Sequence, residues 1–258
     1  MNTSGKLKIA YSKIVDISKL TSEERLSLGD SCWNVFQPHF KNLDKGQVIE
    51  HLFFRSGEGK LFLCYNNEDQ LVGFSSYRRL VIMLHGKKHV VLTIGMWSDL
   101  KYQGFGRRLL RAWVLQTVRY WLKSPLHPLF LAGFTTSPAP YRMVMQGTFT
   151  AYPRGNAQPP KVFVEVMEEV AKRNKMVPVA GRPLVFRESH LLVSHANADK
   201  QSASPTIYQD STYPHYMRMN PDWAQGDMLA TGIPLTMGNL VLTVLKRFFL
   251  RMGGKAPR

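Results

Sequence analysis

One stretch, from Val90 to Lys123, constrains the fold more than any other part of the chain. It begins with the apolar, largely β-branched run VVLTIGMW, which predicts a buried strand. It ends with RRLLRAWVLQTVRYWLK, where apolar residues recur mostly at spacings of three and four and predict an amphipathic helix. Between the two lies KYQGFG, residues 101–106, whose glycines leave backbone N–H groups uncovered where the helix begins. Such a helix start is suited to bind an anion, and Arg107 and Arg108 add two cations.

The order Lys101-x-x-Gly104-x-Gly106-Arg107-Arg108-Leu109-Leu110, behind a strand and opening a helix, resembles the acyl-CoA-binding motif of the GNAT superfamily of N-acyltransferases. The family normally has Arg or Gln where Lys101 stands. A Rossmann motif would need a third glycine in place of Leu109, and a Walker A motif would need GK[ST]. The resemblance implies that the turn holds the pyrophosphate of coenzyme A. The predicted cofactor-binding residues are Met96, Trp97, Lys101, Tyr102, Gln103, Gly104, Phe105, Gly106, Arg107 and Arg108.

The chain before this stretch predicts further strands and a helical segment. Strands are expected at residues 7–16, 60–66 and 71–83, and a helix is expected to start at Thr21, which is followed by first-turn acids. Helical structure should continue to about residue 55, with an interruption near Pro38. This meander, followed by the glycine turn and helix, is the order found in GNAT domains. The fold class expected is therefore α/β (α+β), with a GNAT-like mixed, mostly antiparallel central sheet flanked by helices.

A second family signature, Asn-x-x-Ala-x-x-Leu-Tyr-x-x-x-Gly-Phe, is matched in part by residues 135–153, after a strand expected at 128–134. Ala139 and Gly147 agree with it. The departures are Thr136 in place of the Asn, Met143 in place of the tyrosine with Tyr141 two residues earlier, and Phe149 one residue late. The two matches cover about residues 8–153. We therefore expect a GNAT-like acyltransferase core at 1–153 and a C-terminal extension at 154–258.

In the extension, the sequence predicts a helix at 161–176, a strand at 184–194 and a long, polar, loop-rich segment at 195–234. Four aromatic residues of that region anchor the loop or line a pocket: Tyr208, Tyr213, Tyr216 and Trp223. Residues 239–252 predict an amphipathic helix with two interpretations. Either its apolar face closes the core, or it makes a peripheral contact with a membrane, with Lys246, Arg247 and Arg251 towards anionic headgroups.

The family reaction transfers an acyl group from a thioester to an amine by direct attack. The resemblance implies that backbone N–H groups at Gly95 to Trp97 polarise the thioester carbonyl. It implies Tyr141 as the general acid that protonates the leaving thiolate, and the alternative is a packing tyrosine. Asp99 is the nearest carboxylate to the end of the central strand and is the candidate base, with a water relay as the alternative.

Other chemistries find little support. His85 and His89 flank Gly-Lys-Lys, which indicates a hairpin turn and not a helix that presents two metal ligands, so no metal is expected. No G-x-S-x-G motif is present. Cys32 and Cys64 show no CxxC pairing and are expected to be buried, which suits a reducing, cytoplasmic compartment. The sequence shows neither a signal peptide nor an apolar run long enough to span a bilayer.

The formal charge of +16 favours an anionic partner: the phosphates of coenzyme A, an acidic carrier protein, nucleic acid or an anionic membrane. The leading hypothesis is an N-acyltransferase that uses acetyl-CoA or a longer acyl-CoA and a small-molecule or peptide amine as acceptor. One variant takes its acyl group from an acyl carrier protein. A second hypothesis is a GNAT-fold module that binds CoA or a partner without catalysis. A nucleic-acid binder ranks last, because the sequence has no RNA- or DNA-binding motif.

Overall fold

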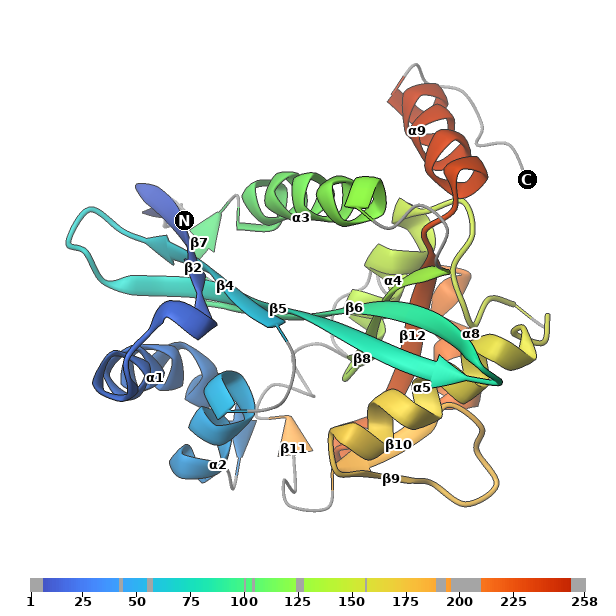
Figure 1. The fold of residues 1–258 in the computed structure, drawn as a ribbon, viewed down its shortest axis with the longest axis horizontal. Coiled ribbons are helices and arrows are strands. Elements are labelled where there is room, and N and C mark those ends of the chain that lie inside the picture. Colours follow the sequence, from blue (N-terminus) through green and yellow to red (C-terminus); the bar gives the residue numbers. More distant parts are fainter. Residues whose placement is uncertain are drawn as a thin grey trace, which may run out of the picture. The chain divides into compact units, whose positions relative to one another are not determined.

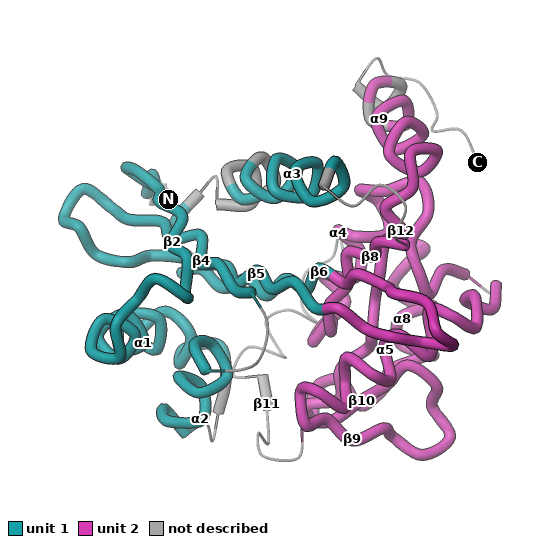
Figure 2. Tube along the Cα trace, viewed as in Figure 1, with its two compact units in different colours: residues 1–80, 92–126 teal, residues 81–91, 127–258 magenta. Residues whose placement is uncertain are grey.

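The strand and the helix predicted around the glycine turn are both present. In the computed structural model Lys87–Ser98 form β6 and Phe105–Lys123 form α3. The structure describes residues 7–41, 44–54, 58–99, 101–103, 105–123, 128–155, 157–188, 194–195 and 210–251. The chain divides into two compact units, residues 1–80 with 92–126 and residues 81–91 with 127–258 (Figure 2). Strand β6 and the preceding strand β5 (Leu71–Leu84) contribute to both units.

The strands of the first unit pair in the order β2, β4, β5, β6. Strand β2 (Tyr11–Asp16) is antiparallel to β4 (Glu58–Tyr65), and β4 is antiparallel to β5. A short parallel pair joins β1 (Leu7–Lys8) to β7 (Tyr102–Gln103). The expected mixed, mostly antiparallel sheet is confirmed.

Helices cover both faces of these strands (Figure 1). The predicted helix start at Thr21 is confirmed, because α1 (Ser22–Phe36) opens with a capping box in which Thr21 and Glu24 bond each other's backbone N–H. The expected interruption near Pro38 is confirmed as well. The short elements of this region are η1 (Ile17–Lys19), η2 (Gln37–His39), β3 (Phe40–Lys41), α2 (Lys45–Ile49) and the π-helical η3 (Glu50–Phe54).

The core of the first unit lies between its strands and the helical segment that runs from α1 to η3. Leu52, Leu61 and Phe74 are almost fully buried in this layer. Both cysteines are buried, as expected, and neither is in a disulfide; burial raises the pKa of the Cys32 thiol. On the opposite face α3 packs through Trp113, whose ring stacks on Tyr77 with centroids 4.4 Å apart.

The second unit contains β8 (Leu129–Thr135), which pairs with β12 (Met228–Pro234), and β12 pairs in turn with β10 (Val185–Glu188). Strand β9 (Met176–Pro178) pairs with β10, and all three of these pairings are antiparallel. The other elements are α4 (Pro138–Gly147), α5 (Lys161–Arg173), β11 (Ser194–His195), α8 (Thr212–Met219), η4 (Trp223–Gln225) and α9 (Met237–Arg251). The helices expected near 161–176 and 239–252 are thus present.

A loop-rich segment was expected at 195–234. This is wrong for residues 212–234, which form α8, η4 and β12. Strand β12 lies between β8 and β10, so its residues are buried without the alternation that marks a half-exposed strand. A side chain at Gly232 would overlap the ring of Phe163 on α5, which explains a glycine inside this strand. Tyr216 and Trp223 are buried and anchor this segment, whereas Tyr208 lies outside the described residues.

The boundary predicted after residue 153 falls inside the second unit. Strand β12, beyond that boundary, pairs with β8, before it, from Leu229↔Thr135 to Pro234↔Phe130. Residues 154–258 therefore supply strands to the sheet of the second unit as well as helices.

Candidate functional site

The end of β6 presents successive side chains to opposite sides. Trp97 packs between Phe36 and Phe74, each with its ring centroid 5.0 Å away, so it belongs to the core layer under α1. Met96 is 36% exposed. The two neighbouring residues of the predicted cofactor site thus have different environments, because side chains alternate along a strand. A side chain at Gly95 would overlap the Trp97 ring, so the strand needs glycine there.

The turn after β6 is held by Asp99. Its Oδ1 accepts a hydrogen bond of 2.9 Å from the backbone N–H of Lys101, and its own N–H donates to the carbonyl of Val72 at 2.9 Å. The backbone N–H of Tyr102 donates to the carbonyl of Asp99 at 3.1 Å. Asp99 therefore shapes the turn through side chain and backbone together. Its predicted role as a base stays a prediction.

Two further contacts fix the turn in the first unit. Strand β1 pairs with it in the register Leu7↔Tyr102 and Lys8↔Gln103. The side-chain amide of Asn66 donates to the Tyr102 hydroxyl at 3.1 Å, and Asn66 is itself buried. Consequently the backbone that leads into α3 is positioned by β1, by β5 and by the turn between β4 and β5.

Helix α3 begins directly after this turn, at Phe105, and its first turn contains no acidic residue. Gly104 lies outside the described residues, and so do the side chains of Gln103 and of Phe105 to Arg108. The helix start leaves its first N–H groups without intrahelical partners and carries a partial positive charge. With Arg107 and Arg108 in the sequence and no acidic residue in the first helical turn, this helix start fits a polyphosphate such as that of coenzyme A.

The structure adds His39, a residue that the sequence analysis did not single out. Its Nε2 lies 3.0 Å from the carbonyl oxygen of Ser98, at the end of β6. A carbonyl only accepts, so Nε2 carries the proton of this contact. Burial lowers the pKa of His39, which favours the neutral imidazole at pH 7. The only signal in the sequence was a histidine within the helical segment, which borders the acceptor site in GNAT domains.

Tyr141, the predicted general acid, lies on α4 in the second unit. It is 1% exposed, and its hydroxyl donates to the carbonyl of Pro153 at 2.8 Å. Burial raises the pKa of Tyr141 well above that of an ordinary phenol. These contacts are those of a packing tyrosine, and the catalytic role stays a prediction. Met143, at the family's tyrosine position, is exposed.

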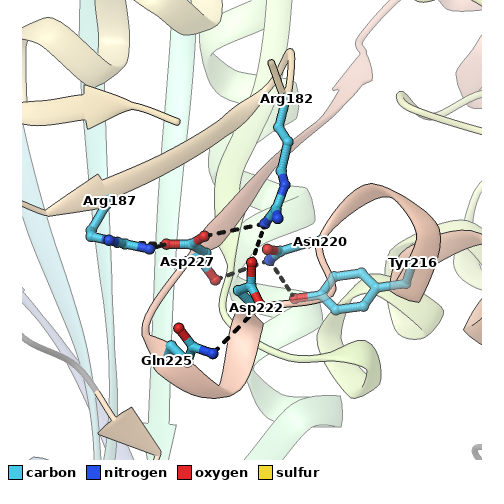
Figure 3. A network of polar contacts seen from close by, with 7 residues as sticks. All are labelled: Arg182, Arg187, Tyr216, Asn220, Asp222, Gln225 and Asp227. Carbon is cyan, nitrogen blue, oxygen red and sulfur yellow. Dashed lines mark hydrogen bonds and ion pairs between the residues drawn. The ribbon is translucent and has the colours of Figure 1, made fainter. Parts of the chain in front are cut away.

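A network of ion pairs around the buried Asp227 occupies another part of the second unit (Figure 3). The carboxylate of Asp227 is fully buried, and its Oδ1 lies 2.6 Å from Nη2 of Arg187 on β10. Arg182 lies 2.5 Å from Asp222 and 3.6 Å from Asp227. Asn220 donates to the carbonyl of Asp227 at 2.9 Å. The network ties β10 to the segment before β12, so these charges stabilise the local fold.

A cleft of about 650 Å³ lies in the first unit beside the second half of α3. Both signs of charge line it: Asp16, Glu58, Lys60 and Arg119. Residues 101–106 lead into the first turn of α3, so the cleft and the predicted cofactor site adjoin different ends of one helix. Within the described part of the chain, no group of three or more His, Cys, Asp or Glu side chains could hold a metal ion.

No family model matches this chain, and no curated protein matches it. It is similar in shape to a probable N-acyltransferase of unknown function from Enterococcus faecalis, with 18% identity over 54% of this chain and a TM-score of 0.34. The chain spans 32% of that protein's length.

Two further structures show likenesses of the same kind. One is an acyl-CoA N-acyltransferase from Pseudomonas aeruginosa, with 18% identity over 54% of this chain and 87% of the other, at a TM-score of 0.36. The other is Arabidopsis thaliana NAA60 in complex with a bisubstrate analogue, with 10% identity over 57% of this chain and 93% of the other, at a TM-score of 0.34. The antiparallel meander of its first unit and the helix α3 that follows β6 give the chain the mixed, mostly antiparallel GNAT-like fold expected from the sequence.

Proposed function

We propose that this protein is an N-acyltransferase that moves an acyl group from acyl-CoA to an amine. The observation that carries the proposal is the strand–turn–helix unit formed by β6, residues 99–103 and α3. Its backbone is anchored on several sides, its helix start lacks acids, and its sequence is K-x-x-G-x-G-R-R. A fixed cluster of backbone donors with added cations is what a pyrophosphate requires.

The reaction needs few groups from the protein. The amine nitrogen attacks the thioester carbonyl carbon, the C–S bond breaks, and the coenzyme A thiolate leaves. Backbone N–H groups at Gly95 to Trp97 would stabilise the negative charge that develops on the carbonyl oxygen. Asp99, His39 or a water relay would accept the proton of the amine, and Tyr141 would supply one to the thiolate.

The proposal names the amine acceptor and the acyl donor by chemical class. The acceptor is a small molecule or a peptide, and the donor is acetyl-CoA or a longer acyl-CoA. The excess of basic residues, 34 against 18 acidic, would equally suit an acidic carrier protein as acyl donor.

One observation favours a second function, a CoA-binding module without catalysis. The Tyr141 hydroxyl is buried and already donates to Pro153, and the family's tyrosine position carries an exposed methionine. A protein of this kind would bind the cofactor at the same turn and release no thiol.

The decisive experiment is calorimetric titration of acetyl-CoA and of a long-chain acyl-CoA, with thiol release measured in the presence of amines. Gly104→Glu places a carboxylate at the pyrophosphate position, so we expect CoA affinity to fall by more than about tenfold. Gly238→Glu is the matched control, because it adds the same charge in the first turn of α9, where a side chain meets open space.

The outcomes separate the candidates. Binding with thiol release supports the enzyme, and binding without release supports the module. Transfer from an acylated carrier protein with no acyl-CoA binding supports the carrier-dependent variant. A Gly104→Glu protein that binds CoA as tightly as the wild type would exclude the turn as the pyrophosphate site.

A further inference from the structure

Helix α9 is attached to its unit through its polar side. Asn239, Thr243 and Lys246 follow one another at spacings of four and three and so lie on one face. The Asn239 side chain donates to the carbonyls of Thr150 and Pro234 at 2.9 and 2.8 Å, and its Oδ1 accepts from the N–H of Thr150 at 2.8 Å.

The other two residues of this face bond the same stretch of backbone. The N–H of Phe149 donates to the Thr243 hydroxyl at 2.9 Å, and the Lys246 ammonium donates to the carbonyl of Thr148 at 2.8 Å. The polar face therefore docks on residues 148–150. The interpretation in which the apolar face of this helix closes the core is wrong for the described residues.

The apolar side of α9 faces outward instead. Its exposed residues, between 43% and 66% accessible, are Met237, Val241, Val244, Leu245 and Phe248. Their spacings of four, three, one and three place them on one continuous stripe. In Figure 1 α9, drawn in red, projects beyond the end of β12, away from the strands of its own unit. Contiguous exposed apolar surface of this kind marks an interaction site.

Charge restricts what this stripe can contact. Residues 237–251 contain no acidic residue, and besides the docked Lys246 they carry Arg247 and Arg251, while the whole chain carries +16. A second copy of the chain would bring the same positive excess against the stripe, which opposes self-association. An anionic lipid surface offers both an apolar layer and negative headgroups.

Length decides how the helix would lie on such a surface. A helix of 15 residues is about 22 Å long, shorter than the roughly 30 Å of a bilayer's hydrocarbon layer. Across the described residues, no helix is long and apolar enough to cross a membrane. We propose that α9 binds the surface of anionic membranes, parallel to the plane of the headgroups, with Val241, Val244 and Leu245 inserted. This inference does not rest on the proposed enzymatic function.

The test is co-sedimentation of the full chain with vesicles of phosphatidylcholine alone, or of phosphatidylcholine and phosphatidylglycerol at about three to one. We expect binding to the anionic vesicles, weaker binding to the neutral ones, and a loss of more than about tenfold in Val244→Glu. Leu26→Glu is the matched control, since Leu26 is a helical apolar residue of similar exposure on α1.

A second measurement locates the contact. Cys32 and Cys64 are fully buried, so a cysteine introduced by Val244→Cys can be labelled selectively with an environment-sensitive fluorophore. Anionic vesicles should shift its emission to the blue, while a label at Leu26→Cys should not respond. Equal binding of wild type and Val244→Glu, or no binding to anionic vesicles, would overturn the proposal. The proposal would also be overturned if the protein formed a dimer that Val244→Glu disrupts and that vesicles leave unchanged.

Discussion

At the scale of single residues, His215 shows how the fold suppresses a charge. The side chain lies on α8, is buried, and neither of its ring nitrogens has a hydrogen-bond partner among the described residues. The ring of Tyr141 lies 6.1 Å away, and Arg218 is on the same helix. Burial first, and then the positive charge of Arg218, lower the pKa of His215.

This burial predicts a loss of stability in mild acid. The pKa of a histidine in an unfolded chain is about 6.5. As the pH falls below this value, His215 is protonated in the unfolded chain but stays neutral in the folded one. The free energy of unfolding should therefore decline from pH 7 towards pH 5. We expect His215→Phe to flatten this decline, measured by urea denaturation at several pH values. An unchanged pH dependence in the variant would show that other groups cause it.

A different residue illustrates the limit of motif reading. Tyr141 lies near the family's tyrosine position in the sequence. In the structure its hydroxyl donates a hydrogen bond to the carbonyl of Pro153, twelve residues later. His39 approaches the end of β6 across 59 residues of sequence. No local pattern encodes a contact of that separation, because it depends on how α1 and η2 pack on the strands.

At the scale of elements, the attachment of α9 is open to a direct stability test. Asn239 is 6% exposed and makes three hydrogen bonds to the backbone. We expect Asn239→Leu to lower the free energy of unfolding by about 2 kcal/mol, because it removes the hydrogen-bond partner of backbone groups of Thr150 and Pro234 that lie against the helix. Urea denaturation measures the loss.

The control for this change is Asn34→Leu, at an exposed position of α1. It makes the same substitution in a helix away from the docking surface, and its effect should stay within about 0.5 kcal/mol. Equal stabilities of the two variants would mean that the polar face of α9 contributes little to its attachment.

Elements with strong local signals were predictable from the sequence. The β-branched run of β6, the spacing of α3 and the Thr21 cap of α1 each specify their structure locally. Strand β12 was not, because it is buried between two neighbours and contains Thr231 and Gly232. The two faces of α9 were readable from their spacing, but which face docks depends on hydrogen bonds to backbone groups of 148–150, about 90 residues earlier in the sequence.

The same holds for the candidate site. The connection from β6 to α3 was predictable because its motif is contiguous, and the cofactor-binding role of that motif stays a prediction. Its anchoring by Asn66 and by β1 was not, since both come from earlier parts of the chain and reach Tyr102 only in the folded unit.

At the scale of the whole molecule, neither compact unit is a continuous piece of chain. The hairpin segment 81–91 belongs with residues 127–258, and the strands on both sides of it belong with the first unit. Val90 and Val91 in this segment are buried, and the N–H of Val90 donates to the carbonyl of Pro128 at 2.9 Å.

We therefore expect that neither residues 1–126 nor residues 127–258 fold alone. The first fragment would expose the apolar hairpin residues, and the second would lack them. Near-UV circular dichroism and urea denaturation of each purified fragment, beside the full chain, measure this. A cooperative unfolding transition in either fragment would contradict it.

The pairing of β8 with β12 also has a consequence for synthesis on the ribosome. Thr135 and Leu229, which pair, are separated by 94 residues. At about 5 to 20 residues per second, β8 emerges roughly 5 to 20 seconds before its partner strand. During that interval the backbone groups of β8 that later bond β12 have no partner strand, and its apolar residues lack the neighbours that β12 supplies.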